Sequence, residues 1–146
     1  MKYYDQLIAH DPENGRYGDC FRTVLACMLD MRPEDFPHPF EDGYVDDDAG
    51  HTFINDFLAT KGLAFVEVPF SGELTLEQIL EHGAAYSKGN RYTLLGNSTT
   101  GVPHFVTCLG NQIDHNPNGA ALVGPAFDTE NEELKWWWVG WLVHKC

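Results

Sequence analysis

The chain has 146 residues, 43% of them hydrophobic, and 22 acidic against 9 basic side chains give it a formal net charge of -13. This length predicts about one domain of ~150 residues, large enough to bury a hydrophobic core. The composition argues against a disordered or fibrous protein. The few basic residues form no cluster, so we expect no nucleic-acid partner. No stretch approaches the ~18 apolar residues of a membrane span, so we expect no membrane partner.

The first residues, MKYYDQLIAHD, lack the basic flank and apolar run of a secretory signal, which predicts a cytoplasmic protein. The four cysteines are widely spaced and none forms a C-x-x-C pair, so they are expected to be free thiols rather than disulfides. His104 and Cys108 on one strand would lie about 13 Å apart, too far to share a zinc ion. We therefore expect no metal and no cofactor. The cysteines are Cys20, Cys27, Cys108 and Cys146.

The first third of the chain predicts two helices separated by a loop. Apolar residues after Cys20 recur with a helical period, and the Arg32-Pro33 pair discourages a longer helix. Turn-forming and acidic residues over 36–50 predict a solvated loop. The spacing of Asp46, Asp47 and Asp48 does not fit a calcium-binding EF-hand. Residues 51–61 again have a helical pattern, with Gly62 as a plausible C-cap.

The remainder of the chain changes from helical to strand patterns. Residues 64–70 predict a strand, and Thr75 with Gln78 forms a capping-box signature for a short helix that ends near Gly83. The later β-branched and aromatic runs predict antiparallel strands. We expect one α+β domain over 1–146, with N-terminal helices packed on a C-terminal antiparallel β-sheet. The later runs are RYTLLGN, PHFVTCL, QIDHN and the tryptophan-rich LKWWWVGWLV, whose tryptophans are expected to pack in the core and on the sheet.

Cys20 is the first candidate for chemistry. It follows a polar, glycine-containing turn and begins the first helix, where the helix dipole and unsatisfied N–H groups lower the pKa of a thiol. The same N–H groups, together with the side-chain amide of Asn14, would form an oxyanion hole. The alternative is a small buried residue that happens to begin a helix. Cys27, two helical turns further on, is expected to pack in the core.

A nucleophilic cysteine needs a base from elsewhere in the fold, and His104 at the start of a strand is the best candidate. A third group should orient the imidazole, and the next segment offers Asp114 and Asn116. If the hairpin loop has an odd number of residues, for example 109–111 with Asn111 in the left-handed region, all three side chains face one side of the sheet. A regular two-residue loop would put His104 on the opposite face from both.

These residues together resemble papain-like cysteine peptidases. Cys20 opens a helix, His104 lies on a strand in PHFVTCLGNQIDHNPNG, and Asn116 precedes a proline. The closest branch is the one that cleaves bacteriocin leader peptides. The segment GDCFRTVLACMLDMRPEDFPH is also similar to short phage and bacterial proteins of this fold. The resemblance covers residues 14–36 and 92–119.

The resemblance implies a papain-like fold in which Cys20 is the nucleophile, His104 the general base and acid, and Asn116 the orienting residue. Asn14 stands where the family usually has an oxyanion glutamine, and Phe21 where the leader-processing branch has glycine. The expected activity is a cysteine hydrolase, a peptidase, amidase or isopeptidase, that acts on a peptide or protein substrate through an acyl-enzyme.

Two other functions stay open. One is a catalytically inactive binding protein on the same scaffold, such as a phage accessory factor that captures a host protein in the host cytoplasm. The other is a thiol endopeptidase that cleaves peptidoglycan. The negative charge counts against the latter, because anionic wall polymers would repel it.

Overall fold

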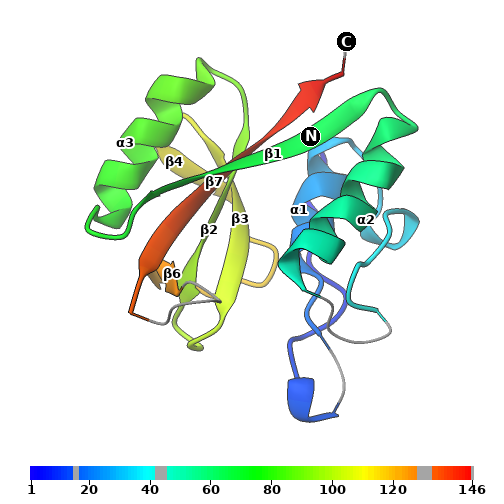
Figure 1. Ribbon diagram of the computed structural model, residues 1–146, viewed down its shortest axis with the longest axis horizontal. Coiled ribbons are helices and arrows are strands. Elements are labelled where there is room, and N and C mark those ends of the chain that lie inside the picture. The colour runs from blue at the N-terminus through cyan, green and yellow to red at the C-terminus, as the bar shows by residue number, and fades with distance from the viewer. Residues whose placement is uncertain (15–16, 42–45, 128–132, 146) are drawn as a thin grey trace. The chain divides into compact units, whose positions relative to one another are not determined.

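A computed structural model describes residues 1–14, 17–41, 46–127 and 133–145. In this part of the chain the architecture is α+β, with three α-helices and a seven-stranded antiparallel sheet (Figure 1). Two short 3-10 helices, η1 and η2, flank the first α-helix. The elements in chain order are η1 (Pro12–Asn14), α1 (Cys20–Met28), η2 (Pro33–Asp35), α2 (Asp47–Ala59), β1 (Leu63–Ser71), α3 (Leu76–Ser87), β2 (Tyr92–Ser98), β3 (Pro103–Leu109), β4 (Gln112–His115), β5 (Leu122–Gly124), β6 (Ala126–Phe127) and β7 (Lys135–His144).

The chain divides into two compact units. The first unit comprises residues 1–66 and 142–146, and the second comprises residues 67–141. Strands β1 and β7 run through the boundary, so each unit contains part of both. The first unit holds α1, α2 and the N-terminal segment, and the second holds α3 and most of the sheet.

Helix α1 forms the buried centre of the first unit. Its residues from Phe21 to Cys27 are all buried, so the burial extends around the helix beyond the apolar face that predicted it. It ends at Met28, ahead of the Arg32-Pro33 pair. The Phe21 ring lies 5.4 Å from the ring of His51 on α2 and 5.3 Å from that of Phe65 on β1. One aromatic side chain thus joins both helices to the strand.

The expected loop over residues 36–50 is too long, because α2 begins inside it. Asp46 is the N-cap of α2, and its side chain accepts a hydrogen bond from the backbone N–H of Ala49 at 2.7 Å. A carboxylate at this position satisfies an otherwise unpaired N–H and interacts favourably with the helix dipole. The acidic run is therefore a helix start, and Gly62 follows the helix with a left-handed φ of 70°.

The capping box predicted for α3 is present, but the helix does not end at Gly83. Thr75 accepts a bond from the N–H of Gln78, and the Gln78 side chain accepts one from the N–H of Thr75. Gly83 lies inside the helix. The position is a glycine because the Tyr92 ring occupies the space that a side chain there would need. The helix continues to Ser87 and covers one face of the sheet (Figure 1).

The sheet has the strand order β1-β7-β2-β3-β4, with β5 paired to β2 and β6 to β7. Strand β2 pairs with β3 from Tyr92 opposite Cys108 to Asn97 opposite Pro103. The β2 and β3 residues that face α3 form the core of the second unit together with Trp137, which is fully buried. These strand residues are Tyr92, Leu94, Val106 and Cys108, and the remaining members of that core are Ile79, Leu80, Leu122 and Val139.

We predict that Gly83→Ala destabilises the protein by about 1–3 kcal/mol, because the new methyl group would overpack the core. A Cβ at this position would clash with the ring of Tyr92. Gly124→Ala is the matched control, since nothing lies within 4 Å of its Cβ position. Urea unfolding followed by circular dichroism measures both variants. Equal stabilities of the two would contradict the packing described here.

Candidate active site

The two halves of the predicted site belong to different units, Cys20 to the first and His104 with Asn116 to the second. Cys20 is the first residue of α1 and is half-buried. The residue before it, Asp19, is fully buried and occupies the N-cap position, yet its side chain caps no N–H of the helix. Its carboxylate therefore serves another purpose.

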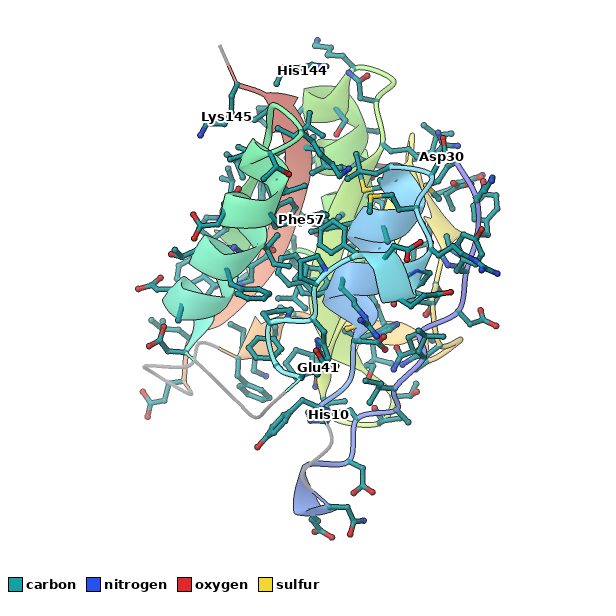
Figure 2. The ribbon with its side chains drawn as sticks, turned by 90° about the vertical axis from the view of Figure 1, so that its right-hand side faces the viewer. His10, Asp30, Glu41, Phe57, His144 and Lys145 are labelled. Carbon is teal, nitrogen blue, oxygen red and sulfur yellow. The ribbon has the colours of Figure 1, made fainter. Side chains whose placement is uncertain are left out.

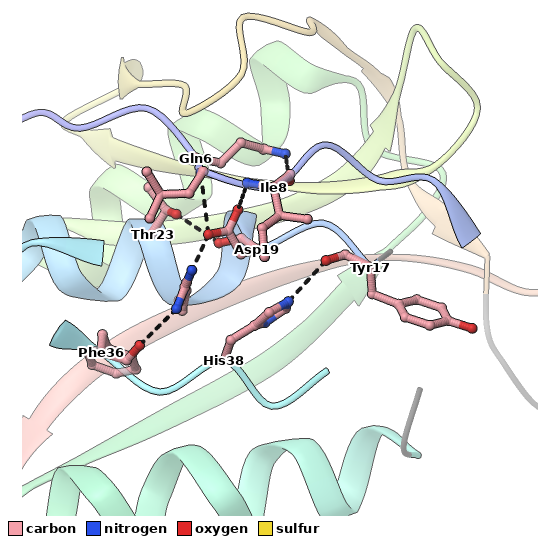
Figure 3. Close-up of polar contacts among 9 residues, drawn as sticks. Gln6, Ile8, Tyr17, Asp19, Thr23, Phe36 and His38 are labelled. Atoms are coloured by element: carbon pink, nitrogen blue, oxygen red, sulfur yellow. Dashed lines mark hydrogen bonds and ion pairs between the residues drawn. The ribbon is translucent and has the colours of Figure 1, made fainter. Parts of the chain in front are cut away.

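Figure 3 shows that purpose: Asp19 is the centre of a buried polar network. Its carboxylate accepts hydrogen bonds from the backbone N–H of Leu7 at 3.3 Å and of Ile8 at 2.9 Å. It also pairs with Nε of Arg22 at 2.8 Å, and Nη1 of Arg22 donates to the carbonyl of Phe36 at 3.3 Å. The guanidinium thus balances the negative charge that directly precedes Cys20.

The turn before Cys20 is held by two histidines. Nδ1 of His10 accepts from the N–H of Gly18 at 3.2 Å, and Nε2 of His38 donates to the carbonyl of Tyr17 at 3.0 Å. His38 is 5% exposed, and this burial lowers the pKa of its imidazole, opposed by the bond to Tyr17. The bond requires a proton on Nε2, and the lowered pKa favours the neutral form of the ring.

Asn14, the expected oxyanion residue, is engaged elsewhere. It ends η1 on the surface, and its side-chain amide donates to the carboxylate of Asp11 at 2.7 Å. The side chain of Asn14 is shorter than the glutamine usual at this position in papain-like peptidases, and it completes a local turn with Asp11. Any oxyanion hole beside Cys20 would then depend on the backbone N–H groups at the start of α1.

The other described cysteines have the properties of packing residues. Cys27 is fully buried, and its sulfur accepts from the N–H of Tyr4 at 3.3 Å. Burial raises the pKa of the Cys27 thiol, and it raises that of Cys108 to about 12. Neither is a thiolate near neutral pH. Among the residues that the structure describes, Cys20, Cys27 and Cys108 form no disulfide.

The second half of the site is the pair of His104 and Asn116. His104 is the second residue of β3 and is 2% exposed. Its Nε2 lies 2.7 Å from Oδ1 of Asn116. It stands opposite Gly96 in the sheet register, where the Trp137 ring fills the space that a side chain at position 96 would take. Burial lowers the pKa of His104, and the hydrogen bond to Asn116 opposes this effect.

The loop around Asn116 determines which imidazole nitrogen carries the proton. Nδ2 of Asn116 donates to the carbonyl of Ala120 at 2.7 Å, and Oδ1 accepts from the N–H groups of Asn118 and Gly119. This pattern fixes the orientation of the amide. Since Oδ1 can only accept, Nε2 of His104 must donate, which leaves the lone pair on Nδ1. The ring is therefore oriented as a base through Nδ1.

A β-bulge brings Asn116 to the face of His104. The hairpin has a two-residue loop, with Leu109 opposite Gln112, and Gly110 rather than Asn111 has the left-handed φ, 59°. The loop is therefore not the odd-numbered one, nor is the two-residue hairpin a regular one, because a bulge follows it. Because Thr107 pairs with His115 after the bulge, the register shifts by one and turns Asn116 to the face shared with His104.

Asp114, the alternative third member, is the extra residue of that bulge. Its carboxylate pairs with Nε of Arg91 at 3.2 Å, in a partly exposed position. The structure thus joins His104 to Asn116 and not to Asp114. Sequence reasoning missed Arg91 and also Arg22, although the D-x-x-R spacing of Asp19 and Arg22 on one helical turn was a usable signal.

No metal site is formed in the described ranges: they contain no group of three or more His, Cys, Asp or Glu residues placed to hold an ion. Within the same ranges, no helix has both the length and the apolar character needed to cross a bilayer. No family model matches this sequence, and no curated protein and no solved structure matches the chain.

We predict that Asp19→Ala lowers the free energy of unfolding by about 3–5 kcal/mol, because it leaves the Arg22 guanidinium buried without its carboxylate. Asp114→Ala, which breaks the partly exposed pair with Arg91, is the matched control and should cost about 0–1 kcal/mol. Urea unfolding gives both values. A similar loss in the two variants would show that the Asp19 network contributes no more than a surface ion pair.

The buried His104 makes stability depend on pH. An unfolded histidine has a pKa of ~6.5, and the folded value is lower, so below that pH the unfolded state binds a proton that the folded state excludes. The contribution of His104 to the free energy of unfolding is therefore fully present above pH ~6.5, and it is lost as the pH drops toward the folded pKa. His38 acts in the same direction.

We predict that His104→Gln reduces the difference in unfolding free energy between pH 7.5 and 5.5 relative to the unsubstituted chain. His82→Gln on the exposed side of α3 is the control and should keep the full difference. Urea titrations at the two pH values measure it. An unchanged difference in His104→Gln would mean that this imidazole titrates alike in both states.

Proposed function

We propose that this chain is a small papain-like thiol hydrolase that cleaves an amide or isopeptide bond in a peptide or protein. Cys20 is the nucleophile, His104 the base and acid, and Asn116 the residue that orients the imidazole. The observation that carries the proposal is the 2.7 Å bond between His104 Nε2 and Asn116 Oδ1. It places the proton of the neutral imidazole on Nε2 and leaves the lone pair on Nδ1, as a general base requires.

In the proposed reaction Nδ1 of His104 takes the proton of the Cys20 thiol, and the sulfur attacks the carbonyl carbon. The tetrahedral intermediate collapses when Nδ1–H returns the proton to the leaving amine, and a thioester to Cys20 remains. Water then attacks the thioester and gives a proton to Nδ1. That proton passes to the sulfur as the acid product leaves.

The position of Cys20 at the start of α1 supports its role. The helix dipole there favours a thiolate, and the first-turn N–H groups are suited to a developing oxyanion. Arg22 balances the carboxylate of Asp19, which would otherwise oppose ionisation of the neighbouring thiol. Asn14 has no part in this proposal, because its amide is committed to Asp11.

We predict that iodoacetamide labels Cys20 far faster than Cys27 or Cys108 at pH 6, well below the ordinary thiol pKa of ~8.5. His104→Ala should slow the labelling of Cys20 at this pH by about tenfold or more, since the thiolate loses its imidazole partner. Rates from pH 4 to 9, resolved for each cysteine by peptide mass spectrometry, measure this. Cys27 and Cys108, both buried with raised pKa values, are internal controls.

The third residue is tested in the same assay. Asn116→Ala should reduce the labelling advantage of Cys20, whereas Asp114→Ala, which removes the partner of Arg91, should leave it unchanged. If Cys20 titrates as an ordinary thiol, or if His104→Ala has no effect, the hydrolase proposal fails. The inactive binding scaffold would then be the better description.

A further inference from the structure

The loop between β4 and β5 contains an asparagine followed by a glycine, Asn118 and Gly119, and both are exposed. Because glycine has no Cβ to shield its backbone nitrogen, this nitrogen reaches the side-chain carboxamide of a preceding asparagine more easily than that of any other residue. The chain contains one other such pair, Asn14 and Gly15, of which Gly15 lies outside the described residues. Figure 2 shows η1, which ends at Asn14, below the labelled His10 and away from α1 and α2.

The contacts of the Asn118 side chain are those that an attack by the next nitrogen needs. Its Oδ1 accepts a hydrogen bond from the N–H of Ala120 at 2.8 Å, which folds the carboxamide back along the segment that contains the Gly119 nitrogen. The same N–H would stabilise the negative charge that develops on Oδ1 when a nitrogen adds to the carbonyl carbon. Since Asn118 is exposed, its amide nitrogen can take up a proton from water and leave as ammonia.

The attacking nitrogen is restrained by Asn116 of the candidate site. The N–H of Gly119 donates to Oδ1 of Asn116 at 3.1 Å, and the N–H of Asn118 donates to the same oxygen at 3.2 Å. The Gly119 nitrogen can add to a carbon only after local opening of the loop breaks its bond and its proton is lost. The reactivity of Asn118 and the orientation of Asn116 therefore depend on the same hydrogen bonds.

We propose that Asn118 is a site of spontaneous deamidation, and that its iso-aspartate product releases Asn116 and with it the His104 imidazole. The Gly119 nitrogen gives up its proton and forms a bond to Cγ of Asn118, the bond from Cγ to Nδ2 breaks, and ammonia leaves. Water then opens the resulting succinimide at either carbonyl. One opening gives aspartate, and the other gives iso-aspartate, whose main chain runs through the side chain and is longer by a methylene group.

The added methylene would lie among the backbone groups that hold the Asn116 amide. These groups are the N–H of Asn118, the N–H of Gly119 and the carbonyl of Ala120. A longer main chain changes their spacing, so the amide cannot keep all three bonds. The imidazole of His104 then loses the fixed acceptor that keeps its proton on Nε2. This inference concerns the geometry of the pair and does not rest on the proposed hydrolase activity.

The first test measures deamidation in the full chain kept at pH 8 and 37 °C. Peptide mass spectrometry gives the rate at each asparagine, and enzymatic methylation identifies iso-aspartate. We expect Asn118 to react at least about tenfold faster than Asn111, because glycine leaves the attacking nitrogen open and glutamine does not. Asn111 is the matched residue, since it is exposed in the preceding hairpin turn but is followed by Gln112. Equal rates at the two asparagines would overturn the proposal.

The restraint by Asn116 is tested with two variants of the same loop region. Asn116→Ala should raise the rate at Asn118 at least about threefold, because the nitrogen that attacks is no longer held. Asp114→Ala, which breaks the pair with Arg91, should leave that rate unchanged. Asn111 should keep its rate in both variants, which shows that the hairpin stays folded. An unchanged rate at Asn118 in Asn116→Ala would contradict the coupling between the two asparagines.

The second test examines the product in a chain with Asn14→Gln, where a single Asn-Gly pair remains. Anion exchange separates the iso-aspartate form by its added negative charge, and the ring ¹⁵N shifts of His104 report which nitrogen carries the proton. We expect the iso-aspartate form to lose the preference for Nε2. Asn118→Asp has the same charge and a normal main chain, so it should keep that preference. Unchanged His104 shifts in the iso-aspartate form, or equal changes in Asn118→Asp, would overturn the proposal.

Discussion

The burial of the Asp19 carboxylate is the constraint on which the first unit depends. An isolated charge in that position would be too costly to bury, so the chain must bring donors to it from several segments. Leu7 and Ile8 supply backbone N–H groups, and Arg22 supplies a guanidinium that also reaches the carbonyl of Phe36. Asp19 and its partner Arg22 thus join the N-terminal segment, the start of α1 and the region of η2. The position of Cys20 follows from this network, because Cys20 is the next residue.

The second unit solves a comparable problem with neutral groups. His104 is buried next to an amide instead of a carboxylate, so no second charge has to be desolvated. Asn116 is itself held by three backbone groups of its loop, at Asn118, Gly119 and Ala120. Gly119 has a φ of 76°, in the left-handed region that favours glycine. The tautomer of the imidazole is therefore a consequence of the loop's backbone conformation.

The sequence was informative where local patterns decide the structure. The helix at Cys20, the capping box of Thr75 and the strand at His104 all lie where their patterns predict them. It failed where tertiary contacts override those patterns. Gly83 does not mark a helix end: the position is a glycine because the Tyr92 ring occupies the space that a side chain there would need. The acids before α2 are a separate case, because the N-cap of Asp46 is a local pattern that the expected loop overlooked. Strands β5 and β6 are two or three residues long, too short for a period to be visible.

For the candidate site, residue types were predictable and geometry was not. The hairpin sequence offered both Asp114 and Asn116, and only the resemblance to the peptidases favoured Asn116. In the structure the bulge distinguishes them, because it turns Asn116 toward His104 and Asp114 toward Arg91. The bulge also sets a rule for chain length. Twelve positions separate His104 from Asn116, and removal of one residue between Thr107 and His115 would turn the amide to the opposite face of the sheet. Insertions and deletions in this hairpin are therefore more damaging to the pair than most substitutions, and a search for similar sites should hold the spacing fixed while it lets side chains vary.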